Sequence, residues 1–148
     1  MRIYLGTDHA GFELKEKLKN FLIELGYEIQ DMGNFIYDEQ DDYSDFIPLV
    51  AGKVAEDPEH SRGIVLGGSG QGEAMVANRI KGVRAAVVYN YNKDIVRLSR
   101  EHNDANILSL GARFLSEEEA KKAVKLWLET QFTNEERHKR RICKLSQL

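Results

Sequence analysis

The residues best suited to chemistry lie in a glycine-rich segment near the middle of the chain. The run GIVLGGSGQGEA spans residues 63–74, and its apolar start leads directly into the closely spaced Gly67, Gly68, Gly70 and Gly72. The glycine spacing is that of a Walker A phosphate loop, but Glu73 and Ala74 replace the lysine and the hydroxyl residue that such a loop needs. The dinucleotide fingerprint and the nucleophile elbow also fail. The segment is therefore not a standard nucleotide-phosphate cradle.

Two interpretations of the glycine segment remain. It could be a tight turn from a strand into a helix, in which Glu73 complements the positive helix N-terminus. It could instead direct several backbone N–H groups toward one point, where they would stabilise a developing oxyanion. We favour the second, because a carboxylate beside such donors suits a general base. The segment thus predicts Glu73 as a base, with Ser69 and the glycines around the reacting group.

Two other segments bring titratable groups toward expected strand ends. Asp8 and His9 follow the first strand. An aspartate there is commonly a helix N-cap, but both residues would also lie at the sheet edge where ligands bind. His102 and Asn103 precede the last strand. The histidine could complement the dipole of the helix that it ends, or it could place an imidazole close to the sheet edge.

Arginines form a third group of candidates. Arg113 comes just after the last expected strand, and Arg137 and Arg141 lie one helical turn apart, with His138 between them. Two arginines at this spacing repel each other and are typical of a solvated face or of one with an acidic neighbour. A bound phosphate would also explain them, because guanidinium groups recognise phosphate through paired hydrogen bonds.

An acidic run, DEQDDYSD, occupies residues 38–45. It lacks the EF-hand pattern, and no histidine or cysteine lies near it in the sequence to complete a transition-metal site. We expect a solvated loop here and no metal site.

The elements that position these groups alternate between strands and helices. The pattern predicts strands at 2–6, 27–31, 63–66, 83–89 and 106–110, and helices at 11–25, 44–56, 72–80, 92–102, 116–131 and 134–145. Ser116 and Glu119 form a capping box at the start of one of these helices. The central strands are apolar on both faces, as in a parallel sheet covered on both sides. We expect one doubly wound α/β domain over residues 1–148.

Composition excludes several classes of protein. The net charge is −3, so binding of nucleic acid through the basic run at 137–144 is disfavoured. The apolar start at Met1–Gly6 is too short for a signal peptide, and no segment has the length of a membrane span. Cys143 is the only cysteine and points to a reducing compartment. We expect a cytoplasmic protein.

Taken in order, the segments resemble the type B ribose-5-phosphate isomerases and their relatives that act on allose and galactose 6-phosphates. The resemblance covers essentially the whole chain and rests on TDHAGFELK, DDYSDF, GIVLGGSGQGEAMVANRIKGVRAA, SREHNDANILSLGAR and RHKRRI. It implies a three-layer α/β/α Rossmann-like sandwich with a five-stranded parallel sheet of order 2-1-3-5-4. It also implies a homodimer or a dimer of dimers, with a C-terminal helix reaching the partner subunit and active sites shared between subunits. No metal or organic cofactor is implied.

The resemblance also implies roles for individual residues. Asp8 and His9 would handle the sugar ring and its hydroxyls, and His102 would assist ring opening with Asn103 beside it. Phosphate would be held by Arg113, Arg137 and Arg141 with His138 among them, and Tyr43 would lie at the pocket rim. Many members carry a cysteine base where this chain has Gly67, whereas a subgroup with G-G-S-G-x-G-E fits it and offers Glu73. Cys143 is then expected to have no catalytic part.

The expected activity is an aldose–ketose isomerisation of ribose 5-phosphate to ribulose 5-phosphate in the non-oxidative pentose phosphate pathway. Glu73 would move a proton between C2 and C1 through a cis-enediolate, and His102 and Asp8 would open the ring. Allose 6-phosphate or galactose 6-phosphate remains an alternative substrate. A non-catalytic nucleotide-binding module and a nucleic-acid-binding protein remain alternatives from other classes, although the first gives Glu73 no task.

Overall fold

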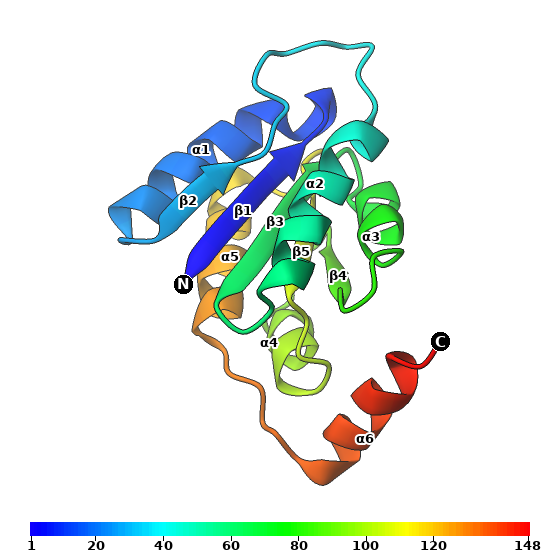
Figure 1. Cartoon of the computed structure of the whole chain (residues 1–148). Coiled ribbons are helices and arrows are strands. Elements are labelled where there is room, and N and C mark those ends of the chain that lie inside the picture. The colour runs from blue at the N-terminus through cyan, green and yellow to red at the C-terminus, as the bar shows by residue number, and fades with distance from the viewer.

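A parallel five-stranded sheet forms the centre of the protein in the computed structural model, which describes all 148 residues (Figure 1). The strands are β1 (Arg2–Thr7), β2 (Glu28–Asp31), β3 (Ser61–Gly67), β4 (Ala85–Val88) and β5 (Ile107–Gly111). They are arranged in the order β2-β1-β3-β5-β4, and all neighbouring pairs run parallel. The predicted doubly wound sheet and its strand order are confirmed.

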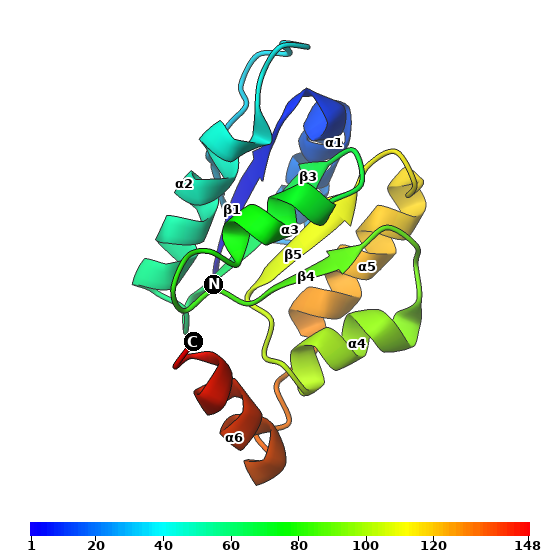
Figure 2. The ribbon, with the colours of Figure 1, turned by 90° about the vertical axis from the view of Figure 1, so that its right-hand side faces the viewer.

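Helices cover both faces of this sheet and make it the middle of three layers. The helices of the sandwich are α1 (Phe12–Glu24), α2 (Tyr43–Glu56), α3 (Gln71–Ala77), α4 (Lys93–Glu101) and α5 (Glu117–Glu129). Figures 1 and 2 show α1, α4 and α5 on one face and α2 and α3 on the other. The larger apolar core lies under α1, α4 and α5 and includes Trp127, and the smaller core lies under α2 and includes Val50.

Local sequence signals account for several element ends. The predicted capping box is present: the Ser116 side chain accepts from the Glu119 N–H, and the Glu119 carboxylate accepts from the Ser116 N–H at 2.9 Å. Helix α3 ends at Ala77, earlier than the predicted residue 80. The reason is Asn78, whose side-chain oxygen accepts from the Ala85 N–H at 2.8 Å and so turns the chain toward β4.

The sheet has a topological switch point between β1 and β3, because β2 lies on one side of β1 and the remaining strands lie on the other. Ligands of open α/β sheets bind at such a switch point, beyond the carboxyl ends of the strands. A short 3₁₀ turn (His9–Gly11) follows β1 and the glycine segment follows β3, so both border this position. The Thr7 hydroxyl ties the two strand ends together by donating to the Leu66 carbonyl at 3.0 Å.

The last helix, α6 (Glu136–Leu145), lies outside the three layers. Figures 1 and 2 show it beyond the opposite end of the strands, connected to α5 by an extended segment. His138 is its only buried residue. No helix of the structure combines the length and the apolar character that crossing a membrane requires.

Candidate active site

The glycine segment is held in place by the neighbouring strand β5. Gly70 has a φ of +76°, and a Cβ atom there would lie 2.9 Å from the carbonyl carbon of Leu110, so both its conformation and its surroundings require glycine. Its carbonyl accepts from the Ser109 hydroxyl at 2.6 Å. The carbonyls of Gly67 and Gly68 accept backbone N–H groups that follow β5, at 2.8 and 3.1 Å. The loop is therefore fixed before any ligand arrives.

The Glu73 carboxylate lies directly over Gly67. A Cβ atom on Gly67 would overlap the Glu73 carboxyl group, so the carboxylate occupies the space that any side chain at position 67 would need. Glu73 is only 4% exposed. Burial raises the pKa of Glu73, and the nearby negative charge of Asp8 raises it further, against a hydrogen bond from its own backbone N–H. The carboxyl group can therefore take up a proton more readily than an exposed glutamate.

Asp8 is a second buried acid at the same edge. It caps the 3₁₀ turn after β1 by accepting from the Ala10 N–H at 3.0 Å, so the N-cap interpretation is confirmed. Burial raises the pKa of Asp8, and the Ala10 hydrogen bond opposes the shift. Capping does not exclude chemistry, because the carboxylate of Asp8 remains close enough to Glu73 for its charge to raise the pKa of Glu73.

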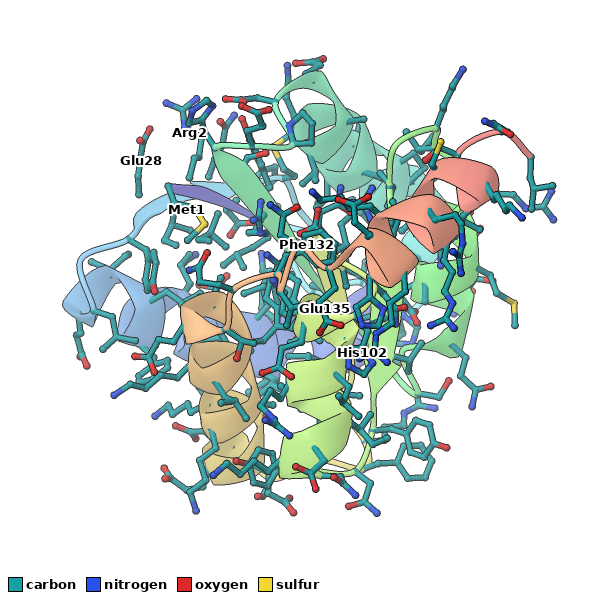
Figure 3. The ribbon with its side chains drawn as sticks, turned by 90° about the horizontal axis from the view of Figure 1, so that it is seen from below. Met1, Arg2, Glu28, His102, Phe132 and Glu135 are labelled. Atoms are coloured by element: carbon teal, nitrogen blue, oxygen red, sulfur yellow. The ribbon has the colours of Figure 1, made fainter.

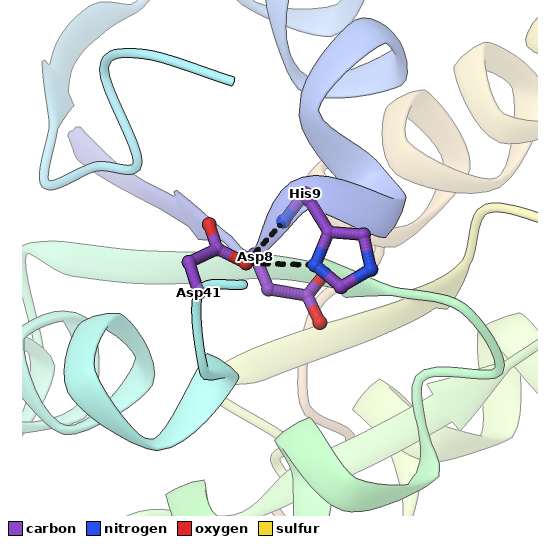
Figure 4. A group of neighbouring side chains, drawn as sticks. All are labelled: Asp8, His9 and Asp41. Carbon is purple, nitrogen blue, oxygen red and sulfur yellow. Dashed lines mark hydrogen bonds and ion pairs between the residues drawn. The ribbon is translucent and has the colours of Figure 1, made fainter. Parts of the chain in front are cut away.

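His9 is anchored by Asp41, a residue of the acidic run at 38–45 that has no local sequence signal for this role. The Asp41 Oδ1 atom lies 2.9 Å from the His9 backbone nitrogen and 2.7 Å from its ring Nδ1, as Figure 4 shows. The Asn34 amide donates to the other Asp41 oxygen at 2.7 Å. The hydrogen bond to Asp41 is the main cause that raises the pKa of His9. With Nδ1 engaged, His9 has its Nε2 atom available for a ligand.

The expectation of a solvated acidic run is wrong for Asp41, whose side chain is 7% exposed. The fold brings His9 next to it from more than thirty residues away, which the local sequence could not reveal. The ligand atoms of Asp8, His9 and Asp41 lie within 4.8 Å of one another, a spacing that a metal ion could bridge. All three residues already have hydrogen-bond partners: Asp8 bonds Ala10, and Asp41 bonds His9 and Asn34. The cluster is thus satisfied as an anchor for His9.

Tyr43 and Arg113 complete the rim of this edge. A Cβ atom on Gly72 would lie 2.8 Å from the Tyr43 ring, and one on Gly68 would lie 3.3 Å from the Arg113 guanidinium. Both side chains therefore pack directly on the glycine loop. Nine predicted residues meet at the carboxyl edge of the sheet: Asp8, His9, Tyr43, Gly68, Ser69, Gly70, Gly72, Glu73 and Arg113.

The remaining predicted residues lie at the amino edge, on the far side of the sheet. Helix α4 runs back from the carboxyl end of β4, so His102 and Asn103 at its end stand beside the start of β5. The sequence predicted an imidazole close to the sheet edge, and within one chain that edge is the amino edge and not the one that carries the glycine loop. The His102 ring stacks on His138 of α6, with centroids 4.2 Å apart and an interplanar angle of 17°. Figure 3 views this edge with His102 labelled.

Helix α6 keeps the other basic groups at the amino edge. Arg137 donates to Glu135 at 2.8 Å, and Arg141 lines a cleft of about 940 Å³ between α6 and the body. The three predicted phosphate ligands are thus divided, since Arg113 lies at the carboxyl edge and the other two lie with α6. Burial lowers the pKa of His138, and the neighbouring His102 lowers it further.

The fold and the carboxyl-edge site together define a class of protein. It is a doubly wound α/β protein with two buried acids and an anchored imidazole at its switch point, a set of groups suited to proton transfer on a small ligand. The comparison with known proteins makes the assignment specific. Residues 3–145 match the model of the Ribose/Galactose Isomerase family, and the chain belongs to that family.

Individual relatives agree with this assignment. The chain is 42% identical to ribose-5-phosphate isomerase B of Mycobacterium tuberculosis over 142 residues, which cover 96% of this chain and 86% of that protein. A ribose-5-phosphate isomerase B structure from Clostridium thermocellum superposes with a TM-score of 0.92 at 41% identity, covering 99% and 96% of the two chains. One from Mycoplasma genitalium, with bound ribulose 5-phosphate, gives a TM-score of 0.94 at 37% identity and 99% and 94% coverage.

Proposed function

We propose that residues 1–148 act as one sugar-phosphate isomerase domain that interconverts ribose 5-phosphate and ribulose 5-phosphate in the non-oxidative pentose phosphate pathway. The family match and the relatives named ribose-5-phosphate isomerase B support this function. The observation that carries it is the buried Glu73 carboxylate seated over Gly67 beside Asp8. The single exposed cysteine, Cys143, favours a cytoplasmic location.

Glu73 is the proposed base. With its pKa raised by burial, the carboxylate removes the C2 proton of the open-chain sugar and returns it to C1 through a cis-enediolate. The Ser69 hydroxyl and the N–H groups of the glycine loop stabilise the oxyanion that forms. Removing one such donor raises the barrier by about 3 kcal/mol in comparable sites. Because Glu73 fills the space over Gly67, the site can hold a glutamate base at position 73 or a side chain at position 67, but not both.

The sugar ring and its hydroxyls are handled by Asp8, His9, His102 and Asn103. Asp8 and His102 move the protons that open the furanose, and His9, held by Asp41, presents Nε2 to a hydroxyl. Tyr43 closes the rim over Gly72. The phosphate is bound by Arg113, Arg137 and Arg141, with His138 beside them.

These roles require two copies of the chain. Glu73 lies at the carboxyl edge of the sheet, whereas His102 and Arg137 lie at the amino edge, so a single chain cannot offer all of them to one pentose. We propose a homodimer, alone or as half of a tetramer, in which the C-terminal helix reaches the partner and each active site combines the two edges. The cleft beside α6 supports this, because its lining includes the exposed Leu145 and the half-buried Ile80 and Ile142.

Mixing two impaired variants, one without the proposed base and one with weakened phosphate binding, tests the shared site. In a hybrid of Glu73→Gln with Arg137→Ala, one site receives both defects and the other receives neither. Equal mixing should therefore restore about a quarter of wild-type activity, measured at a substrate concentration well below KM. If each site belonged to one chain, the activity of the mixture would equal the average of the activities of its two parents.

The substrate is tested by direct assay of ribose 5-phosphate against allose 6-phosphate and galactose 6-phosphate. We expect the highest kcat/KM on ribose 5-phosphate, with Glu73→Gln as the control for contaminating isomerases. A higher kcat/KM on a hexose 6-phosphate would move the assignment to the other branch of the family. Tight ATP or FMN binding without isomerisation would favour a nucleotide-binding module.

A further inference from the structure

A small pocket at the amino edge is lined by none of the residues proposed for the isomerisation. Its volume is about 270 Å³, and the residues that matter for its chemistry are Glu59, His60, Arg62, Arg100, Thr130 and Gln131. It is formed by the start of β3, the last turn of α4 and the segment that follows α5. Met1 also lines it and is labelled at this edge in Figure 3.

Arg62 places a partly used guanidinium in this pocket. It shares the sheet face of Ile64 and Leu66, which belong to the larger core. Its Nη1 atom donates to the Pro58 and Ser61 carbonyls at 2.8 and 2.6 Å. Its Nε and Nη2 atoms have no hydrogen-bond partner in the chain. Two donors of one guanidinium fork are therefore free.

Arg100 supplies a second guanidinium from α4. It is 3% exposed, with Nη1 bound to Asp104 at 2.8 Å and Nε donating to the Thr130 carbonyl at 3.3 Å. Its Nη2 atom has no partner in the chain. Because the Nη2 atom is not enclosed by the protein, although Arg100 as a whole is buried, this donor is available to an acceptor that enters the pocket.

The charges around the pocket are unbalanced. Burial lowers the pKa of Arg62, and the positive charges of Arg100 and Arg84 lower it further, with Asp104 as the carboxylate that opposes them. Asp104 is already shared, at 2.8 Å from Arg84 and 2.8 Å from Arg100. Three guanidiniums therefore face one carboxylate.

The other titratable groups at the pocket do not supply the missing charge. Glu59 is exposed at the rim and makes no ion pair. His60 directs its Nδ1 atom to Asp57 at 2.9 Å. A small anion is the species that would satisfy both the free donors and the charge.

We propose that this pocket binds a small oxyanion, a phosphate or a carboxylate, between the guanidiniums of Arg62 and Arg100. Each guanidinium offers donors in the planar arrangement that matches two oxygens of such a group. The site also includes Thr130 and Gln131 of the segment that connects α5 to α6. Arg100 bonds the Thr130 carbonyl, and three residues on, Thr133 donates its N–H and its hydroxyl to the Glu101 carbonyl at 3.2 and 2.8 Å. Binding therefore stiffens the connection between α4 and α6.

The test follows the Nε–H resonances of Arg62 and Arg100 by NMR during titration with inorganic phosphate. An Arg113→Ala/Arg137→Ala background weakens phosphate binding at the proposed active site, so the experiment does not depend on the isomerase assignment. We expect saturable shifts of both resonances and slower amide exchange in residues 130–135. Chloride at the same ionic strength should produce neither. Succinate in a parallel titration shows whether the pocket prefers carboxylate.

Arg62→Gln should weaken binding at least about tenfold, because it removes the charge and the fork. Arg2→Gln is the matched control: Arg2 is an exposed arginine paired with Glu28, and its loss should leave binding unchanged. If Arg62→Gln does not fold, Arg62→Lys keeps the charge without the fork and should still weaken binding severalfold. Shifts that grow without saturation for both anions, or that survive the Arg62 substitution, would overturn the proposal.

Discussion

The two edges of the sheet differ in how firmly they hold their functional groups. At the carboxyl edge, hydrogen bonds from β5 fix the glycine loop, and the Glu73 carboxylate fits against Gly67. At the amino edge, the proposed phosphate ligands Arg137 and Arg141 belong to α6, in which His138 is the only buried residue. A fixed edge suits the proton transfer, which tolerates little displacement. An edge on a separate helix suits contacts that a second copy completes.

The largest effect is expected for Glu73→Gln, which removes the proposed base from the fixed edge. We expect kcat on ribose 5-phosphate to fall by about 10²–10⁴, with KM changed by less than about threefold. Steady-state kinetics at pH 7 measure both. A kcat close to wild type would show that Glu73 is not the base.

The same substitution tests the burial of the carboxylate by its effect on stability. The pKa of Glu73 is raised in the folded state, so the ionised carboxylate is less stable there than in the unfolded chain. Above the ordinary pKa of glutamate this difference lowers the free energy of unfolding, whereas at low pH, where the group is protonated in both states, it has no effect. Glu73→Gln should therefore raise Tm at pH 7 and leave it unchanged near pH 4. If the variant and the wild type had the same Tm at pH 7 as well as at pH 4, the buried position of the carboxylate would be contradicted.

Gly67→Ala tests the close fit between the two residues. The new methyl group would overlap the Glu73 carboxylate and displace it, and a shift of about 1 Å can lower the rate about 10²-fold. Gly52→Ala is the matched control, since no atom lies within 4 Å of a Cβ placed there. Only the first variant should lose kcat, and equal losses in both would reject the geometric explanation.

Arg137→Ala tests the amino edge, where a phosphate contact should affect binding more than chemistry. We expect KM to rise about tenfold, the effect of one charge-assisted hydrogen bond, with kcat within about threefold of wild type. Arg140→Ala, one residue from the proposed ligand Arg141, serves as the control. An effect confined to Tm would instead indicate a structural role for Arg137.

The smallest effect is expected for the pH dependence of α6 attachment. Burial and His102 lower the pKa of His138, Arg137 and Arg141 contribute in the same direction, and Glu135 opposes them. When folding lowers the pKa of a histidine, the folded state binds the proton less well than the unfolded state. The stability of the folded state is therefore greatest above the ordinary pKa of histidine and decreases as pH falls below it. Attachment of α6 should therefore weaken from pH 7.5 to pH 5.5.

Hydrogen exchange of residues 136–145, corrected for the intrinsic pH effect, measures this change. We expect a severalfold loss of protection in the wild type. His138→Gln should show weaker protection at pH 7.5 and little further loss at pH 5.5. Protection independent of pH in the wild type would mean that the imidazole stack does not control the attachment.

Much of the fold was predictable because its signals are local. Alternating apolar strands and amphipathic helices indicated the doubly wound sheet, and Ser116 with Glu119 marked the start of α5 where the structure has it. Other features were not local. Asp41 reaches His9 across the fold, and Asn78 ends α3 by bonding a strand that follows it. Neither partner can be recognised from neighbouring residues alone.

The order of the elements and the candidate reactive groups follow from short-range signals, because hydrophobic period, capping residues and glycine spacing act over a few residues. Which of these groups come into contact depends on the three-dimensional packing of the elements. A helix that connects two parallel strands runs from the carboxyl edge of the sheet back to the amino edge. The end of α4 therefore places His102 at the amino edge, away from Glu73, although both have proposed roles in the reaction. Close packing then placed the Glu73 carboxylate over Gly67 and gathered Arg62, Arg84 and Arg100 around Asp104. These meetings depend on long-range packing, which local sequence cannot specify.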